Sequence, residues 1–143
     1  LARISHNCDC FIETSSPDLT EYVVSRWYRA PEIVLVPGRY GKAQDVWSAG
    51  CTFVEMYKRA PVFPGNSVVH QLHVIVDILG TPTEEDLNFE MSDRSRRYME
   101  GIQSANIGLH QAAEGADKIH KDLFHLLQQM LSFNPNKRIS SYN

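Results

Sequence analysis

Hydrophobic residues recur at helical spacing through most of the chain after residue 30. Residues 44–58 leave hardly any polar stripe, which is typical of a helix in the middle of a core. Residues 67–80 follow a 3.6-residue period between a capping serine and a glycine, with His70, Gln71 and His73 expected on the outer face. A third amphipathic pattern predicts a helix over residues 118–132, which an Asn-Pro pair then ends.

Shorter patterns predict further helices. One runs from Pro31 to about Val36, one follows the capping residues 81–83, and one covers residues 93–100. Residues 102–117 are typical of a loop with a turn at 111–113. No segment alternates with a two-residue period and no Asn-Gly or Asp-Gly hairpin signal occurs, so we expect a mainly α fold.

The first 32 residues differ from the rest. Residues 1–22 are polar and predict an exposed, mobile loop, while residues 23–32 predict an ordered but irregular segment. The Thr20-Glu21-Tyr22 tripeptide places two hydroxyls near three arginines, Arg3, Arg26 and Arg29. Phosphorylation of both would add roughly three to four negative charges, which guanidinium groups bind well. An ordinary exposed Thr and Tyr is the alternative that the tripeptide alone leaves open.

Composition narrows the function classes. A length of 143 residues suits one domain, and 43% hydrophobic with 22% charged residues is typical of a globular protein. A formal charge of −3 argues against nucleic acid or an anionic membrane as the main partner. No apolar run suits a membrane-spanning helix, no signal peptide is evident, and three cysteines favour a reducing compartment.

The sequence gives little indication of a metal site or of a cysteine nucleophile. Cys8 and Cys10 with His6 have no second ligand pair at structural-zinc spacing, and Cys51 falls in the most apolar helix. We therefore predict no metal site and no cysteine nucleophile. Glu32 and Arg138 are expected to pair across the fold, because a buried carboxylate needs a partner.

A family resemblance begins at the tripeptide. Residues 20–32, Thr-Glu-Tyr-Val-Val-Ser-Arg-Trp-Tyr-Arg-Ala-Pro-Glu, resemble the end of the activation loop in mitogen-activated protein kinases, including the Ala-Pro-Glu signature of protein kinases. Four more landmarks follow in order: Asp-Val-Trp-Ser-Ala-Gly-Cys at 45–51, Phe-Pro-Gly at 63–65, Ile-Leu-Gly-Thr-Pro at 78–82 and Phe-Asn-Pro-Asn-Lys-Arg-Ile at 133–139. The Thr-Glu-Tyr form resembles the extracellular-signal-regulated branch or its plant and protist relatives.

The resemblance implies the helical C-terminal lobe of the protein-kinase-like fold, incomplete and without the N-terminal lobe. Residues 1–32 would be the activation segment and residues 33–143 the helical lobe, with the kinase insert at about 81–117. The chain would begin just after the Asp-Phe-Gly motif and form about half of a catalytic domain, so it would contain no catalytic residue and have no activity alone. We also expect apolar surface on the front of the central helix to be left exposed.

The resemblance also implies roles for individual residues. Thr20 and Tyr22 would accept phosphates, with phosphothreonine held partly by Arg3 and phosphotyrosine by Arg26 and Arg29. The pocket for the proline of a substrate would be formed by Val23, Val24, Ser25 and Arg29. A hydrophobic docking pocket would be lined by Ile33, Val34, Leu35, Val69, Leu72 and Tyr98. The structural residues would be Asp45, which braces the catalytic loop, and the buried pair Glu32 and Arg138.

The function implied is part of a proline-directed serine/threonine kinase in a MAP kinase cascade. The parent enzyme would use ATP and Mg²⁺, neither bound by the residues present, and its partners would be an upstream dual-specificity MAP kinase kinase, substrates with Ser/Thr-Pro sites and phosphatases. The resemblance implies a cytoplasmic and nuclear location. The alternative is a non-catalytic interaction module or pseudokinase, and a catalytic-loop aspartate with an Asp-Phe-Gly motif upstream would favour the enzyme.

Overall fold

The computed structural model describes residues 26–36, 41–113 and 119–140, and within these ranges the regular elements are helices, with no strand. They are α2 (Pro31–Leu35), α3 (Lys42–Lys58), α4 (Val68–Leu79), α5 (Asp93–Glu100), α6 (Leu109–Ala112) and α7 (Lys121–Met130). The predicted mainly α fold class is confirmed. None of the described helices is long and apolar enough to cross a membrane.

Capping residues fix several helix ends. The Ser67 hydroxyl accepts a hydrogen bond from the His70 amide at the start of α4, and Ser92 accepts one from Ser95 at the start of α5. Helix α4 ends at Gly80, whose φ of 95° favours glycine. Helix α3 ends at Arg59 in the left-handed region, with φ 62°.

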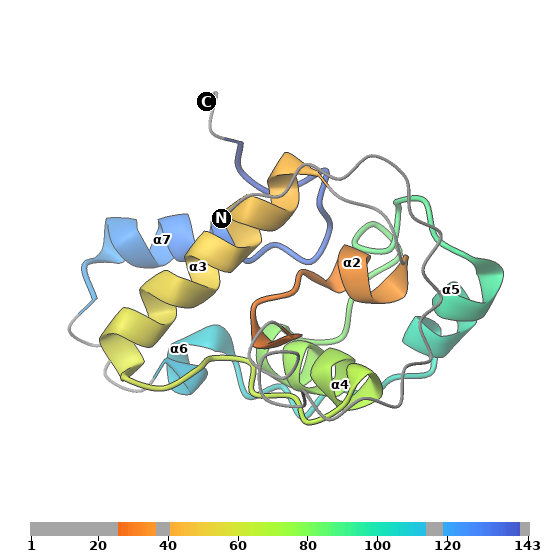
Figure 1. The fold of residues 1–143 in the computed structure, drawn as a ribbon, viewed down its shortest axis with the longest axis horizontal. Coiled ribbons are helices and arrows are strands. Elements are labelled where there is room, and N and C mark those ends of the chain that lie inside the picture. The colour runs from red at the N-terminus through yellow and green to blue at the C-terminus, as the bar shows by residue number, and fades with distance from the viewer. Residues whose placement is uncertain (1–25, 37–40, 114–118, 141–143) are drawn as a thin grey trace, which may run out of the picture.

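Helix α3 packs against α7, and α2 and α6 pack against α4 (Figure 1). Buried residues of these helices and of the loops between them form one core. Trp47, Cys51 and Val54 supply the buried face of α3, and burial raises the pKa of the Cys51 thiol. A Cβ atom at Gly50 would lie 3.0 Å from Leu131 Cδ2 and 3.1 Å from Met130 Cβ. Glycine therefore lets α3 approach the end of α7 closely.

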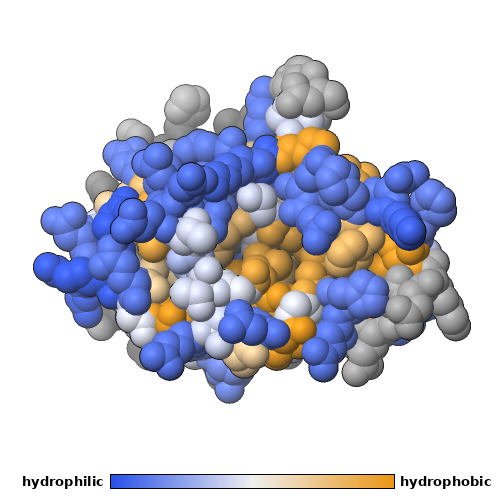
Figure 2. All heavy atoms as spheres, turned by 180° about the vertical axis from the view of Figure 1, so that it is seen from behind, coloured by the Kyte–Doolittle hydropathy of each residue, from blue (hydrophilic) through white to orange (hydrophobic). Residues whose placement is uncertain are grey.

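The predicted all-round burial of the central helix is wrong for one flank of α3. Phe53 and Tyr57 are each 44% exposed and Met56 is 64% exposed. In the view from behind that of Figure 1, hydrophobic residues gather in the middle of the face, with hydrophilic residues around them (Figure 2).

Residues 81–87 differ from the short helix predicted there. They form a single turn in which the Asp86 carboxylate accepts hydrogen bonds from the Thr83 amide, at 3.0 Å, and the Thr83 hydroxyl, at 2.8 Å. The chain then turns inward because Leu87 and Phe89 are buried, which ends the helical path after one turn. The turn predicted at 111–113 lies at the end of the short helix α6.

Candidate functional site

Part of the predicted site lies outside the described residues. The predicted residues that lie there are Thr20, Tyr22, Arg3, Val23, Val24 and Ser25, together with Cys8 and Cys10. The described part begins at Arg26 and includes the Trp-Tyr-Arg-Ala-Pro-Glu stretch, residues 27–32. The site is therefore built from this stretch and the helices that hold it.

A buried ion pair fixes the end of the stretch. Arg138 Nη1 donates to Glu32 Oε1 at 2.7 Å and Nη2 donates to Glu32 Oε2 at 2.9 Å, with 5% and 4% of the two residues exposed. Arg138 also donates to the carbonyls of Ala43 and Ser132, and its guanidinium lies 5.0 Å from the centre of the Trp47 ring. The pairing expected from the sequence is present, and it joins α2 to α3 and to the chain after α7.

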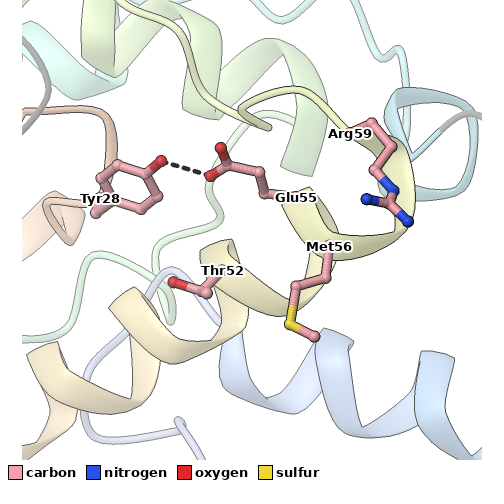
Figure 3. Close-up of a pocket in the computed structure, with 5 residues that line it drawn as sticks. All are labelled: Tyr28, Thr52, Glu55, Met56 and Arg59. Atoms are coloured by element: carbon pink, nitrogen blue, oxygen red, sulfur yellow. Dashed lines mark hydrogen bonds between the residues drawn. The ribbon is translucent and has the colours of Figure 1, made fainter.

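Tyr28 is held on α3 at two points. The Ser48 hydroxyl donates to the Tyr28 carbonyl at 2.9 Å, and the Tyr28 hydroxyl donates to the Glu55 carboxylate (Figure 3). The bond to Glu55, then burial, then the Glu55 charge raise the pKa of Tyr28 to about 12. Thr52, Met56 and Arg59 line an open surface hollow with these two side chains.

Trp27 is held by the loop between α3 and α4. The Trp27 indole donates to the Gly65 carbonyl at 2.9 Å. The Gly65 amide in turn donates to Gln71 Oε1 at 3.0 Å, and Gln71 Nε2 donates to the Phe63 carbonyl at 3.0 Å. The stretch 27–32 is thus attached to the helical body at Trp27, Tyr28 and Glu32.

The predicted outer-face position of Gln71 is wrong, because its side chain is fully buried. The residues at 75 and 78, which follow Gln71 at helical spacing, are buried isoleucines, so the spacing itself places Gln71 on the inner face. The chain tolerates a buried amide there because both its oxygen and its nitrogen have partners in the 63–65 loop. His70 is exposed and His73 is half-buried.

Arg26, Arg29 and Asp45 have different environments. Arg26 is 8% exposed, Arg29 is half-buried, and the Arg29 amide donates to the Arg26 carbonyl at 3.0 Å. Asp45 is exposed in the first turn of α3, where the helix dipole stabilises its negative charge. The phosphate-binding and bracing roles of these residues stay predictions.

The predicted docking residues come from three neighbouring helices. Helix α2 packs against α4, and the Ser95 hydroxyl of α5 donates to the Leu35 carbonyl of α2 at 3.1 Å. Val69 and Tyr98 are exposed, and Tyr98 contacts His73, one turn after Val69, through a 3.1 Å hydrogen bond and an edge-to-face ring contact. Ile33 and Val34 are half-buried, whereas Leu35 and Leu72 lie in the core and offer little surface.

Metal ligands do not gather in the described ranges. No group of three or more His, Cys, Asp or Glu side chains lies close enough there to hold a metal ion. Cys51 is buried beside α7, and its raised pKa keeps it a thiol rather than a thiolate nucleophile.

The described residues form helices and no strand, which is consistent with the C-terminal lobe of a protein kinase. Residues 8–143 match the protein kinase domain family, and the chain belongs to it. Within that family it is a homologue of the mitogen-activated protein kinases. It is 41% identical over 145 residues to mitogen-activated protein kinase 3 of Arabidopsis thaliana, and 42% identical over 147 residues to mitogen-activated protein kinase 2 of the same plant.

A fungal relative is similarly close. The chain is 42% identical over 141 residues to the mitogen-activated protein kinase KSS1 of Saccharomyces cerevisiae. These alignments cover 96% to 99% of this chain but only 38% to 39% of the relatives. The chain therefore spans well under half the length of the curated relatives it matches.

Proposed function

We propose that this chain supplies the activation segment and the substrate platform of a proline-directed serine/threonine kinase in a MAP kinase cascade. Residues 1–32 act as the activation segment, and residues 33–143 form the helical lobe, with an insert at about 81–117. The observation that carries the proposal is the attachment of residues 27–32 to the helical body through Trp27, Tyr28 and Glu32. Membership of the kinase family and homology to the MAP kinases support it.

The switch in this proposal is the pair Thr20 and Tyr22. An upstream dual-specificity MAP kinase kinase adds phosphates to both hydroxyls, and phosphatases remove them. Arg3 binds the phosphothreonine, while Arg26 and Arg29 bind the phosphotyrosine through charge-assisted hydrogen bonds. The short sequence distance from Tyr22 to Arg26 and the fixed position of residues 27–32 support this assignment.

The substrate surface follows directly in the sequence. Val23, Val24, Ser25 and Arg29 accept the proline that follows a target Ser or Thr, because proline has no N–H and suits a wall without an acceptor. Substrates of this class are proteins with Ser-Pro or Thr-Pro sites, in the cytoplasm and the nucleus. Asp45 braces the catalytic loop from the exposed first turn of α3.

A second surface recruits partners by docking. Exposed Val69 and Tyr98, with half-buried Ile33 and Val34, present apolar groups from α2, α4 and α5 to an aromatic docking motif of a substrate. Leu35 and Leu72 support this surface from the core.

ATP and Mg²⁺ serve the protein kinase family in general. The described residues include no group of three or more His, Cys, Asp or Glu side chains that could hold a metal ion. The role of this chain is to hold the switch and the protein substrate in place.

The switch is tested in the full-length protein by combining Thr20→Ala with Tyr22→Phe. After treatment with an active MAP kinase kinase, the wild type should phosphorylate a Ser-Pro peptide, and the double variant should lose nearly all of this activity. The matched control is Thr52→Ala with Tyr57→Phe, which changes the same residue types on the exposed part of α3. Equal activation of wild type and switch variant would contradict the switch, and a wild type that binds peptide without phosphorylating it would favour a non-catalytic module.

A further inference from the structure

Gln71 is the most buried polar residue of the described part that the proposed function does not use. Its side chain is fully buried, although the three residues before it at the start of α4, residues 68–70, are exposed. Its amide reaches the 63–65 loop, accepting from the Gly65 amide and donating to the Phe63 carbonyl, each at 3.0 Å. A buried amide with both ends satisfied holds its partners in one geometry.

Gly65 links Gln71 to Trp27 through its two backbone hydrogen bonds. A Cβ atom at residue 65 would lie 2.3 Å from Gln71 Oε1 and 2.5 Å from Gln71 Cα, so the loop crosses α4 at a distance that only glycine permits. The Gly65 amide is held by Gln71, and its carbonyl accepts the Trp27 indole N–H at 2.9 Å. Gln71 and Trp27 therefore bind opposite ends of one residue.

Phe63 connects the loop to the buried ion pair. Its ring stacks on Trp47 with the ring centres 5.3 Å apart, and Trp47 lies beside the Arg138 guanidinium. Since Gln71 also holds the Phe63 carbonyl, the loop is fixed against the same core that anchors Glu32. The two ends of the stretch, at Trp27 and Glu32, are therefore both attached to the same part of the core.

We propose that Gln71 is a positioning residue that sets the place of the substrate-binding segment by holding Gly65 against Trp27. Trp27 precedes Arg29 by two residues, so a shift of its indole moves the chain on which this proposed substrate contact lies. The inference rests on the proposed function, because it assigns Gln71 to peptide binding in that same kinase.

The expected signature is a change in peptide affinity. A looser segment weakens the bound peptide in the ground state and the transition state alike, which raises KM and leaves kcat unchanged. A purely structural role would instead lower the fraction of active enzyme, and so lower apparent kcat at constant KM. The KM of ATP should not change in either case.

The test uses the activated full-length protein and a Ser-Pro peptide. Gln71→Leu keeps a similar size and removes both hydrogen bonds, and Trp27→Phe removes the indole donor and one ring of the side chain. We expect each to raise the peptide KM roughly three- to tenfold, the effect of about one hydrogen bond. The double variant should match the larger single effect, because both changes break one connection. His70→Ala is the control, since His70 accepts from the neighbouring Asn66 amide but is exposed.

Two results would overturn the inference: multiplicative KM effects in the double variant, or a Gln71→Leu effect confined to kcat. A stability measurement separates this inference from the proposed function. If the wild type shows no phosphoryl transfer, the proposed function fails. Urea unfolding of the wild type, the two single variants and the double variant then tests whether Gln71 and Trp27 are coupled. Non-additive changes in the free energy of unfolding would then support the link between Gln71 and Trp27, and additive changes would contradict it.

Discussion

Arg138 is the residue whose loss we expect to cost the most stability. It carries a buried charge with a bidentate partner, three carbonyl acceptors and a contact with the Trp47 ring. Arg138→Met leaves the Glu32 carboxylate buried without its cation, which should lower the free energy of unfolding by about 3 to 5 kcal/mol. Chemical denaturation measures this change.

The paired variant provides the control for Arg138. Glu32→Leu combined with Arg138→Met removes both charges, so its cost should be smaller than the sum of the two single substitutions. Strictly additive costs would show that the two side chains do not stabilise each other.

Tyr28 gives a prediction at alkaline pH. Its pKa is raised from 10.0 to about 12 by the hydrogen bond to Glu55, by burial and by the Glu55 charge. A raised pKa in the folded state means that the stabilisation is complete below pH 10 and is lost as the pH rises toward 12. The difference in unfolding free energy between wild type and Tyr28→Phe should therefore shrink over this window, as followed by urea unfolding at several pH values. A constant difference would contradict the coupling to Glu55.

At the residue scale, the sequence predicts contacts that follow from charge burial and misses those that follow from loop geometry. The Glu32–Arg138 pair was predictable because a carboxylate in apolar sequence needs a cation. The bond from Trp27 to Gly65 was not, because it depends on how the 63–65 loop crosses α4. Gln71 is intermediate: helical spacing places its side chain on the buried face of α4, but it does not identify the hydrogen-bond partners in the 63–65 loop.

At the scale of elements, Gly50 controls how closely α3 approaches α7. An added Cβ would meet Leu131 at 3.0 Å and Met130 at 3.1 Å, in a core that cannot easily move. Gly50→Ala should therefore lower the free energy of unfolding by about 1 to 3 kcal/mol, despite the better helix propensity of alanine. Thermal or urea unfolding measures it.

Gly101→Ala is the matched control for Gly50. Its Cβ would meet only the carbonyls of Arg97 and Tyr98 at 3.6 Å, which is ordinary contact, and Gly101 has a helical backbone. We expect a change within about 0.5 kcal/mol of zero. Equal costs at the two glycines would show that helix packing does not decide the effect.

Lys137 joins the chain after α7 to the turn at 83–87. Its ammonium contacts Glu85 at 3.0 Å and Asp86 at 3.2 Å. Burial opposes ionisation of Asp86, but hydrogen bonds from Thr83 and Lys137 outweigh it and lower the pKa of Asp86 below 3.8. The resulting stabilisation is present above the unfolded pKa of 3.8 and is lost as the pH falls through the lower folded pKa.

Asp86→Asn should therefore destabilise the chain at neutral pH and match the wild type more closely in acid. Lys137→Met should weaken the same pH dependence, and added salt should reduce its effect because the ammonium is exposed. Lys121→Met, an exposed lysine in the first turn of α7, is the control. A wild type and an Asp86→Asn variant that differ equally at all pH values would contradict this account.

The long helices were predictable as elements because their apolar residues recur at 3.6-residue spacing. The pattern for residues 67–80 corresponds to α4 at Val68–Leu79, and the pattern for 93–100 corresponds to α5. The predicted helix after residue 83 failed because burial of Leu87 and Phe89 decides the path, and helix capping signals do not contain that tertiary information.

At the scale of the whole molecule, one flank of α3 departs from the burial that its apolar sequence suggests. Phe53, Met56 and Tyr57 face outward, while Trp47, Cys51 and Val54 of the same helix fill the core. A helix with apolar groups on both faces suits a position between two layers. Within the described ranges, α7, Tyr28 and Phe63 cover parts of α3, whereas Phe53, Met56 and Tyr57 stay exposed. The sequence predicted the apolar helix, but packing decides which of its faces is covered.

This exposed flank should make the 143-residue chain associate when it is prepared alone. Adjacent exposed apolar side chains reduce their contact with water by meeting other molecules. Sedimentation experiments should show an average mass that rises with concentration, and the combined substitutions Phe53→Gln, Met56→Gln and Tyr57→Gln should suppress the rise. Ile107→Gln removes a similarly exposed apolar residue away from α3 and should leave association unchanged. A monomer at all concentrations, or equal suppression by Ile107→Gln, would contradict the assignment of association to the α3 flank.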